Sequence, residues 1–281
     1  MSMETDRDRS TPKPPTAAPL RLCLATQNPH KVSELYALLT AMLPSLQGRL
    51  SLVSLAELGV HDDVVEDGET FADNARKKAE AAHRRTGLWS LADDSGLMVD
   101  ALDGAPGVHS ARYAGEPRSD ARNLAALLEA LRGVPTAQRT ARFQCTLCLV
   151  GRDALGEVCL LRSGRCEGTL RSDPLGLHGF GYDPLFVPNP AELHAAGLPA
   201  ALCGRTFAEL TADQKNRLSH RTRAVQALSP LLIALCEALS DAGDAGAPGR
   251  HVSPLRRLPA TQPEISTEAA HDSLPSAAVL G

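Results

Sequence analysis

The sequence predicts an α/β fold in which a mixed β-sheet is flanked by helices. Strand-like and helix-like segments alternate through 20–132, an order typical of parallel strands joined by helices. Two alternating strand patterns then follow one another directly, at 142–150 and 157–162, and the turn between them contains Gly151 and Gly156. This second pattern predicts an antiparallel hairpin. Because one sheet would contain both kinds of pairing, we expect it to be mixed.

The first predicted strand and helix occupy 20–42. The segment LRLCLAT at 20–26 is short and apolar and ends in polar residues, which favours a buried strand. Asn28 is a good helix N-cap and Pro29 is tolerated at the first helical position, so a helix is expected to begin there. Its apolar residues recur at helical spacing: Val32, Leu35, Leu39 and Met42. A polar turn therefore joins a buried strand to this helix.

The later elements follow from similar signals. A helix rich in Ala and Lys is predicted at 70–85 and ends at Gly87. The segment 90–92 is interpreted as a short strand that leads into an acidic loop at Asp93. Further helices are predicted at 120–132, ahead of a Gly-Val-Pro sequence, and at 222–239, where an apolar face closes the domain.

Composition and charge exclude several classes of protein. The 281 residues include 29 Lys and Arg against 33 Asp and Glu, giving a formal net charge of −4 without a basic block for nucleic acid. No apolar run approaches the roughly 20 residues that span a bilayer, and the N-terminal sequence lacks the apolar region of a signal peptide. Seven scattered cysteines favour free thiols in a reducing cytosol. We therefore expect a cytoplasmic protein that binds neither membrane nor nucleic acid.

The patterned sequence forms one predicted domain at 20–240. Residues 1–19 and 241–281 contain little to bury and no sustained periodicity, so both are expected to be disordered tails. Inside the domain, Cys145 and Cys148 have CxxC spacing, but residues three apart on a strand face opposite sides. No second cysteine pair lies at zinc-finger spacing, so a zinc site is not expected.

The polar turn after the first strand is the first candidate site. A strand-to-helix junction presents backbone N–H groups and the positive end of a helix dipole, which suits a phosphate group. The alternative is that Asn28 only caps the helix and that Lys31 points into solvent. The turn consists of Thr26, Gln27, Asn28, Pro29, His30 and Lys31.

Paired carboxylates form the second candidate. Asp93 and Asp94 follow an apolar strand, and adjacent carboxylates need a cation or a raised pKa. Mg²⁺ commonly takes one or two carboxylates together with substrate phosphates, although Asp-Asp-Ser-Gly is also good turn chemistry. The acidic stretch 62–69 is expected to be mostly solvated, with one carboxylate able to complete the metal site.

Two later segments complete the candidates. Glycines alternate with aromatic residues at 176–184, where Phe180 or Tyr182 can stack on a planar ligand; the alternative is a glycine-rich loop packed on the core. A local basic cluster is formed by Lys215, His220 and Arg221, and it can bind oxygen ligands. The alternative is that these residues belong to the exposed start of a helix.

In chain order, the segments TQNPHK, ETFADNARKKA, LADDSGLMVDALDGAPGVHSARYAG, FGYDPLF and TFAELTADQKNRLSHR resemble the inosine triphosphate pyrophosphatase family over 22–239. The resemblance implies an elongated, two-lobed α/β domain with a mixed central sheet and a substrate cleft between the lobes. It also implies a homodimer that uses Mg²⁺ to hydrolyse a purine nucleoside triphosphate to the monophosphate and pyrophosphate. The bacterial members are XTP/dITP diphosphatases, which remove the deaminated nucleotides ITP, dITP and XTP and so keep them out of DNA and RNA.

The resemblance also assigns roles to residues of this sequence. Glu66 and Asp94 match the metal carboxylates, and Asp94 matches the general base, with Asp93 as the neighbouring acid that remains an alternative proton acceptor. The basic groups are expected to make the site locally positive in an acidic protein. Rival hypotheses are a Maf-like nucleotide diphosphatase and a catalytically inactive nucleotide sensor. The substrate-binding matches are the turn from Thr26 to Lys31, then Lys78, Ser95, Phe180, Gly181, Tyr182, Asp183, Lys215, His220 and Arg221.

Overall fold

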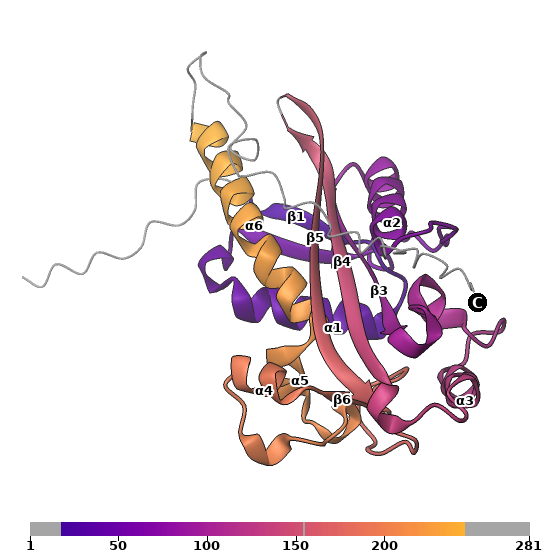
Figure 1. Ribbon diagram of the computed structural model, residues 1–281. Helices are drawn as coiled ribbons and strands as arrows, with labels where there is room; N and C mark the ends of the chain where they lie inside the picture. The colour runs from indigo at the N-terminus through magenta and orange to yellow at the C-terminus, as the bar shows by residue number, and fades with distance from the viewer. Residues whose placement is uncertain (1–17, 154, 245–281) are drawn as a thin grey trace, which may run out of the picture.

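The computed structural model describes residues 18–153 and 155–244, and its centre is a six-stranded mixed sheet (Figure 1). The strands lie in the order β2-β1-β3-β4-β5-β6. β1 pairs in parallel with β2 and β3, and all the remaining pairs are antiparallel, which confirms the predicted mixed sheet. The strands are β1 (Leu20–Leu24), β2 (Leu50–Ser54), β3 (Trp89–Val99), β4 (Thr140–Asp153), β5 (Gly156–Leu170) and β6 (Phe186–Pro188).

Helices cover both faces of this sheet. α1 and α6 bury their leucines on one face, and the alanines of α2 pack on the other. α2 begins with a capping box between Thr70 and Asp73 and ends at Gly87, whose φ of 68° suits glycine. The helices are α1 (Pro29–Met42), α2 (Phe71–Thr86), α3 (Asp120–Ala130), α4 (Pro190–Ala195), α5 (Ala212–Leu218) and α6 (His220–Asp244).

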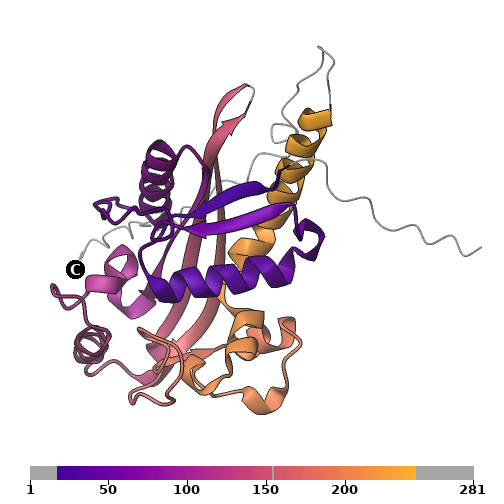
Figure 2. The same ribbon diagram turned by 180° about the vertical axis from the view of Figure 1, so that it is seen from behind.

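Two hydrophobic cores lie along the long β4–β5 hairpin and give the domain its two lobes. Leu147 and Leu149 of β4 belong to the core shared with α1 and α6. Ala141 and Phe143, nearer the start of the same strand, belong to a second core with residues of α3, α4 and α5. The views from both sides show these two groups of helices at different ends of the hairpin (Figures 1 and 2). This arrangement confirms the expected elongated α/β fold.

α6 is apolar because it is a core helix of the first lobe. Its segment His220–Leu239 has the length and composition of a membrane-spanning helix, with a mean hydropathy of 1.3. However, Leu228, Leu231, Leu232 and Leu235 are buried against α1 and the sheet. Packing within the domain therefore accounts for the apolar character of this helix.

Several predicted boundaries differ from the structure. β3 does not end at residue 92 but continues through the acidic segment to Val99, because its backbone pairs with β4 along the whole length. The hairpin strands are longer than predicted for the same reason. α6 begins at His220 rather than at 222 and continues to Asp244, past the predicted end of the domain. Apart from the few residues at their inner ends, both predicted tails lie outside the described residues.

Candidate active site

The candidate site opens beside β3 at the point where its neighbour β1 ends. The last paired residues are Leu24 and Leu91, so β1 does not cover the edge of β3 beyond that point. A pocket lies there between the two lobes, with about 1350 Å³ of empty space, open solvent included. As predicted, the pocket lies at the carboxyl end of β1.

The polar turn after β1 reaches the pocket, but its backbone donors are occupied. Asn28 Oδ1 accepts hydrogen bonds from the N–H groups of His30 at 2.9 Å and Lys31 at 3.3 Å, and Thr26 Oγ1 accepts from Asn28 N–H. The backbone N–H groups that were expected to be free for a phosphate therefore already donate to the N-cap side chain. Lys31 does not point into solvent, because its Nζ lies 3.0 Å from Asp93 Oδ2 and its side chain is only 15% exposed.

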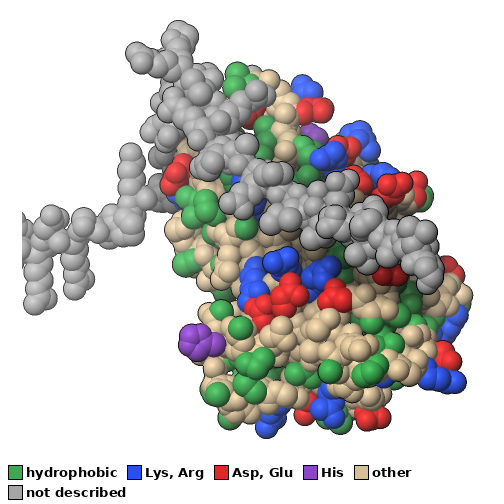
Figure 3. All heavy atoms as spheres, in the orientation of Figure 1, with side chains coloured by type: hydrophobic (Ala, Val, Ile, Leu, Met, Phe, Trp, Pro, Cys, Tyr) green, Lys and Arg blue, Asp and Glu red, His purple; other side chains and the backbone are tan. Residues whose placement is uncertain are grey.

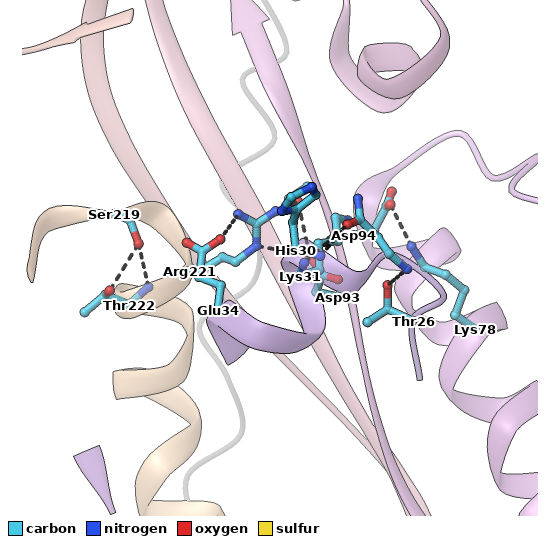
Figure 4. A network of polar contacts seen from close by, with 12 residues as sticks. Thr26, His30, Lys31, Glu34, Lys78, Asp93, Asp94, Ser219, Arg221 and Thr222 are labelled. Carbon is cyan, nitrogen blue, oxygen red and sulfur yellow. Dashed lines mark hydrogen bonds and ion pairs between the residues drawn. The ribbon is translucent and has the colours of Figure 1, made fainter. Parts of the chain in front are cut away.

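β3 places Asp93 and Asp94 on opposite faces of the sheet, since successive side chains of a strand alternate. Asp93 shares its face with Ser95, whose hydroxyl donates to Asp93 Oδ2 at 3.1 Å. Asp94 faces α2 instead, where Lys78 lies (Figure 4). Repulsion between the adjacent carboxylates is reduced because each carboxylate has a cation on its own side.

Asp93 is the centre of a buried ion-pair cluster. Its Oδ2 also accepts from Arg221 Nε at 3.4 Å, and the Arg221 guanidinium donates to Glu34 at 2.9 Å and to Ser95 at 2.8 Å. Burial opposes the charged form of Asp93, but Lys31 and Arg221 outweigh it and hold the pKa of Asp93 well below its ordinary value. Asp93 is therefore an ionised residue that orients the cations around it.

Asp94 has a different environment. Lys78 Nζ donates to its Oδ1 at 2.9 Å, and Asn74 Nδ2 donates to its Oδ2 at 3.3 Å. Burial raises the pKa of Asp94, and the neighbouring Lys78 only partly opposes that effect. Of the two aspartates, Asp94 has the higher proton affinity, and it lines the pocket.

The loop before α2 brings a second carboxylate beside Asp94. Lys78 Nζ lies 3.4 Å from Glu66 Oε1, so one ammonium group contacts both carboxylates. Arg112 donates to the carbonyl oxygen of Glu66 at 2.6 Å and thereby fixes this part of the loop. The adjacent Asp67 points outward and pairs with the exposed Lys77. Of this part of the acidic stretch, Glu66 faces the pocket and Asp67 is solvated.

Glu66 and Asp94 fit the chemistry of an Mg²⁺ site. They provide two hard oxygen ligands at the pocket wall, and Mg²⁺ ordinarily completes its coordination with water and substrate phosphates. Within residues 18–153 and 155–244, no group of three or more His, Cys, Asp or Glu side chains is arranged to hold a metal ion. The protein part of such a site is therefore limited to this pair of carboxylates.

Both aromatic residues of the glycine-rich loop, Phe180 and Tyr182, border the pocket. The ring of Phe180 stacks on that of His30, with centroids 5.7 Å apart, and the side chains of Lys215 and Arg221 lie over it at 4.9 and 5.5 Å. Tyr182 is buried in the core of the second lobe, where its hydroxyl donates to the carbonyl oxygen of Ser110. The two aromatic residues therefore differ: Phe180 is half-buried in the pocket wall, and Tyr182 is mainly a packing residue.

Asp183 and His220 are buried polar residues of the pocket wall. Asp183 accepts from Lys215 Nζ at 2.7 Å and from the backbone N–H of Phe180, so it fixes the loop on the basic cluster. His220 stacks on Phe143, and its Nδ1 is buried without a hydrogen-bond partner. Burial, together with Arg221 and Lys215, lowers the pKa of His220 well below its ordinary value, so the imidazole is neutral. Gly181 completes the loop by donating its backbone N–H to Asp120.

The local positive charge was expected from the basic groups together with a metal ion, and the basic groups alone do not provide it. The pocket is lined by six Lys and Arg residues but also by six Asp and Glu residues. The basic side chains that the sequence analysis singled out are each paired with a carboxylate, as for Lys215 with Asp183. The pocket by itself is therefore close to neutral, and a polyanionic ligand needs an additional cation.

Several residues of the site were missed by the sequence analysis. Glu34, Asn74 and Arg112 hold Arg221, Asp94 and the Glu66 loop respectively. Spacing offered a signal for the first two, because Glu34 lies one turn beyond Lys31 on α1, and Asn74 lies one turn before Lys78 on α2. Arg112 gave no comparable signal.

These features define an α/β protein whose pocket lies between two lobes and is lined by buried cations paired with carboxylates. The chain belongs to the Ham1 family, which it matches over residues 22–231. The resemblance inferred from the sequence motifs is thereby confirmed.

Named relatives and solved structures agree with this assignment. The dITP/XTP pyrophosphatase of Desulforamulus reducens is 46% identical over 217 residues, which are 76% of this chain and 96% of that protein. That of Xanthomonas oryzae pv. oryzae is 47% identical over 214 residues, 76% of this chain and 98% of that one. The structure of a HAM1 protein from Coxiella burnetii has a TM-score of 0.62 at 38% identity, covering 76% of this chain and 98% of its own.

Proposed function

We propose that this protein hydrolyses deaminated purine nucleoside triphosphates (ITP, dITP and XTP) to the monophosphate and pyrophosphate, with Mg²⁺ as cofactor. The family assignment supports this proposal, and so does the activity that the relatives' names state. The observation that carries it is the pair of carboxylates, Glu66 and Asp94, which converge on Lys78 at the wall of the pocket. An Mg²⁺–triphosphate complex is the ligand that such a pair suits.

Asp94 is the proposed general base. A water molecule attacks the α-phosphorus, and Asp94 accepts or orients its proton, because burial raises the pKa of this carboxyl toward the working range of a base. Asp93 is unsuited to that role, since Lys31 and Arg221 hold it ionised at a low pKa. Asn74 positions Asp94 through its side-chain amide. The proposal thus assigns proton transfer to Asp94 and orientation of the cations to Asp93.

The departing pyrophosphate is stabilised by lysines of the pocket. Lys31, Lys78 and Lys215 come from α1, α2 and α5, so they approach the pocket from three directions. Their carboxylate partners hold them in place before substrate binds, which lowers the reorganisation needed in the transition state. Mg²⁺, held by Glu66 and Asp94, would supply the positive charge that this neutral pocket lacks. Thr26, Gln27 and Asn28 of the first turn border the same pocket.

Base selection is assigned to Phe180, His220 and Arg221. Phe180 provides a stacking surface that is indifferent to ring substituents. N–H groups of Arg221 or His220 donate to the 6-oxygen of hypoxanthine or xanthine. When ATP enters, they face another donor, the 6-amino group. GTP is rejected at position 2 of the base, where guanine carries an amino donor. Protein donors at that edge tolerate the hydrogen of hypoxanthine and the oxygen of xanthine, but they repel the amino group of guanine. Unpaired buried polar groups discriminate strongly, so ITP should exceed ATP and GTP by on the order of 10² or more in kcat/KM.

A panel of nucleoside triphosphates, with analysis of pyrophosphate against orthophosphate, tests this proposal. We expect pyrophosphate release from ITP, dITP and XTP in the presence of Mg²⁺, with ATP and GTP slower. Comparable hydrolysis of all purines would contradict the base assignment. Binding of ITP without turnover would instead show a nucleotide sensor, and preferential hydrolysis of pyrimidine or methylated nucleotides would favour the Maf-like alternative.

The cellular role and assembly are part of the same proposal. Removing deaminated nucleotides from the pool keeps them out of DNA and RNA, a role that places the enzyme in the cytoplasm. The family resemblance also favours a homodimer. Size-exclusion chromatography with light scattering tests the dimer, and a mass corresponding to one chain would contradict it.

A further inference from the structure

Two cysteines lie in contact on the β4–β5 hairpin, outside the pocket. Cys148 Sγ and Cys159 Sγ are 3.6 Å apart. In the strand register Cys148 pairs with Leu161 and Cys159 with Val150, so the two cysteines are diagonal neighbours on the same face of the sheet. The partner of Cys148 in space is therefore not Cys145, the other cysteine of the CxxC sequence, which belongs to the core on the opposite face.

The two thiols differ in exposure. Cys148 is buried beneath α2 among Ala75 and Ala79, whereas Cys159 is exposed to solvent. A small oxidant can therefore reach the Cys159 sulfur directly, while Cys148 is protected. Such an arrangement gives one thiol the role of the attacking group and leaves the other as the resolving group.

The charges around this pair favour a thiolate at Cys159. The hydrogen bond with Cys148 and the Arg76 guanidinium of α2 lower the pKa of Cys159, against the opposing effects of burial and Glu80. The same hydrogen bond, together with burial, raises the pKa of Cys148. Because thiolates and not thiols are the nucleophiles, Cys159 is the more reactive member of the pair.

We propose that Cys148 and Cys159 form a modification site, a dithiol that hydrogen peroxide converts into a disulfide linking β4 to β5. A disulfide needs sulfur atoms about 2.05 Å apart, so rotation of the two side chains has to close the remaining gap. The site is independent of the proposed hydrolysis, because neither cysteine lines the pocket.

The chemistry balances in two steps. The Cys159 thiolate attacks one oxygen of hydrogen peroxide, the O–O bond breaks, and the released hydroxide takes a proton to become water. Cys159 is then a sulfenic acid, its sulfur oxidised by two electrons. The Cys148 sulfur attacks the Cys159 sulfur, the S–S bond forms and the S–O bond breaks. The departing hydroxide combines with the thiol proton of Cys148, so two thiols and one peroxide give one disulfide and two water molecules.

Peptide mapping of the full-length protein tests the proposal. The reduced protein is treated with stoichiometric hydrogen peroxide, alkylated and digested without reductant. We expect a cross-linked peptide containing Cys148 and Cys159, lighter by two hydrogen atoms, in the wild-type protein and in Cys203→Ser, the matched variant lacking another exposed cysteine. In Cys148→Ala or Cys148→Ser, dimedone should instead trap Cys159 as the sulfenic acid. Two different replacements guard against a folding defect at this buried position.

A competition for alkylation gives a second readout. At neutral pH, iodoacetamide should modify Cys159 at least about tenfold faster than the exposed Cys203, because of its larger thiolate fraction. Equal rates for the two cysteines, or peroxide oxidation of Cys159 without the cross-link to Cys148, would overturn the proposal. Both measurements use thiol chemistry alone, so their result is separate from that of the nucleotide panel.

Discussion

Asp93 and Asp94 are adjacent in sequence and equal in charge, yet their surroundings separate them. The alternation of side chains along β3 directs Asp93 toward Lys31 and Arg221, and directs Asp94 toward Lys78. Two strong cations lower the pKa of Asp93, whereas burial dominates at Asp94 and raises its pKa. One strand thus provides both an anchor for cations and a candidate base.

Asp94→Asn should lower kcat by at least about 10²-fold, the low end for a lost acid–base group. The amide keeps the size of the side chain but can neither accept the proton nor supply a charged metal ligand. Steady-state pyrophosphate release with saturating Mg²⁺ measures the effect. Asp100→Asn is the control, since Asp100 follows the same strand directly but pairs with Arg142 on the surface. Equal turnover in wild type and Asp94→Asn would remove Asp94 from the mechanism.

Lys31→Ala should reduce stability as well as substrate binding, because it removes a cation from the buried Asp93. Leaving a buried acceptor less well paired costs about 1–3 kcal/mol. An acid whose pKa is lowered on folding stabilises the fold above its ordinary pKa of 3.8 and loses that contribution as the pH falls toward the folded pKa. The cost of Lys31→Ala should therefore be full at about pH 6 and shrink below about pH 4.

Denaturant unfolding of both proteins across this pH range measures the difference in the free energy of unfolding. Lys77→Ala is the matched control, because Lys77 forms an exposed pair with Asp67. Exposed pairs contribute only about 0–1 kcal/mol. A cost for Lys31→Ala that is no larger than that of the control, or that grows in acid, would show that Lys31 does not stabilise Asp93.

The sequence predicted the charged residues of the site better than their partners. Lys31 and Asp94 were recognisable because charged groups near strand and helix ends suit phosphate and metal chemistry, and Lys78 was assigned from the family resemblance. Glu34 was not recognisable, because a glutamate in a helix of this kind is ordinarily solvated. Its partner Arg221 lies 187 residues away in the sequence. The pairing that makes the pocket neutral is tertiary, and no local pattern encodes it.

Among the elements, β3 shows why the predicted loop at Asp93 was wrong. Asp, Ser and Gly are depleted in strands and favour turns, so local preference ends the strand before Asp93. In the fold, β4 pairs with β3 from Ser90 to Val99, and each polar side chain finds a partner on its own face. Tertiary pairing therefore overrides local preference. The periodicity of α1, and the Ala- and Lys-rich composition of α2 before Gly87, let both helices be predicted nearly to their ends.

Gly96 keeps β3 close to the 3₁₀ helix Gly107–Arg112, so Gly96→Ala should disturb both the strand and the site. A Cβ at this position would lie 2.5 Å from the carbonyl oxygen of Gly107 and 2.3 Å from Ser110 Oγ. Because one of these atoms belongs to the backbone, a side-chain rotation cannot relieve the contact. Overpacking of this kind costs about 1–3 kcal/mol.

Thermal unfolding and kcat measure the consequences of Gly96→Ala. We expect a lower Tm together with reduced turnover, since Asp94 and Ser95 lie directly before the displaced residue in β3. Wild-type stability would show that β3 and the 3₁₀ helix separate easily. Lower stability with unchanged kcat would show that the site tolerates a shift of this strand.

Over the whole molecule, charges of both signs are intermingled. Lys and Arg side chains lie beside Asp and Glu side chains on the face shown in Figure 3. The chain carries a net charge of −4, and the pocket contains equal numbers of basic and acidic residues. Neither the surface nor the pocket attracts a triphosphate through net charge. Under the proposed function, a divalent cation has to accompany the substrate.

Removing divalent cations should therefore abolish turnover and weaken nucleotide binding. With excess chelator, a tetra-anionic triphosphate meets a neutral pocket that includes the carboxylates of Glu66 and Asp94, and repulsion opposes binding. Added Mg²⁺ should restore both properties, as measured by pyrophosphate release and by calorimetric titration with a non-hydrolysable triphosphate. Full activity in chelator would contradict the metal assignment.

Glu66→Gln separates the metal site from general charge effects. Losing one of two protein carboxylates should raise the Mg²⁺ concentration for half-maximal activity by at least about tenfold, since even outer-shell changes cost roughly 10–100-fold in metal affinity. Asp67→Asn removes the same charge one residue further along, where the side chain points to Lys77 and solvent. Because both variants change the net charge of the protein equally, a shift confined to Glu66→Gln can only reflect the position of that carboxylate beside Lys78 and Asp94. The same Mg²⁺ dependence in both variants would contradict the role of Glu66 as a metal ligand. The Mg²⁺ requirement would then come from formation of the Mg²⁺–nucleotide complex in solution.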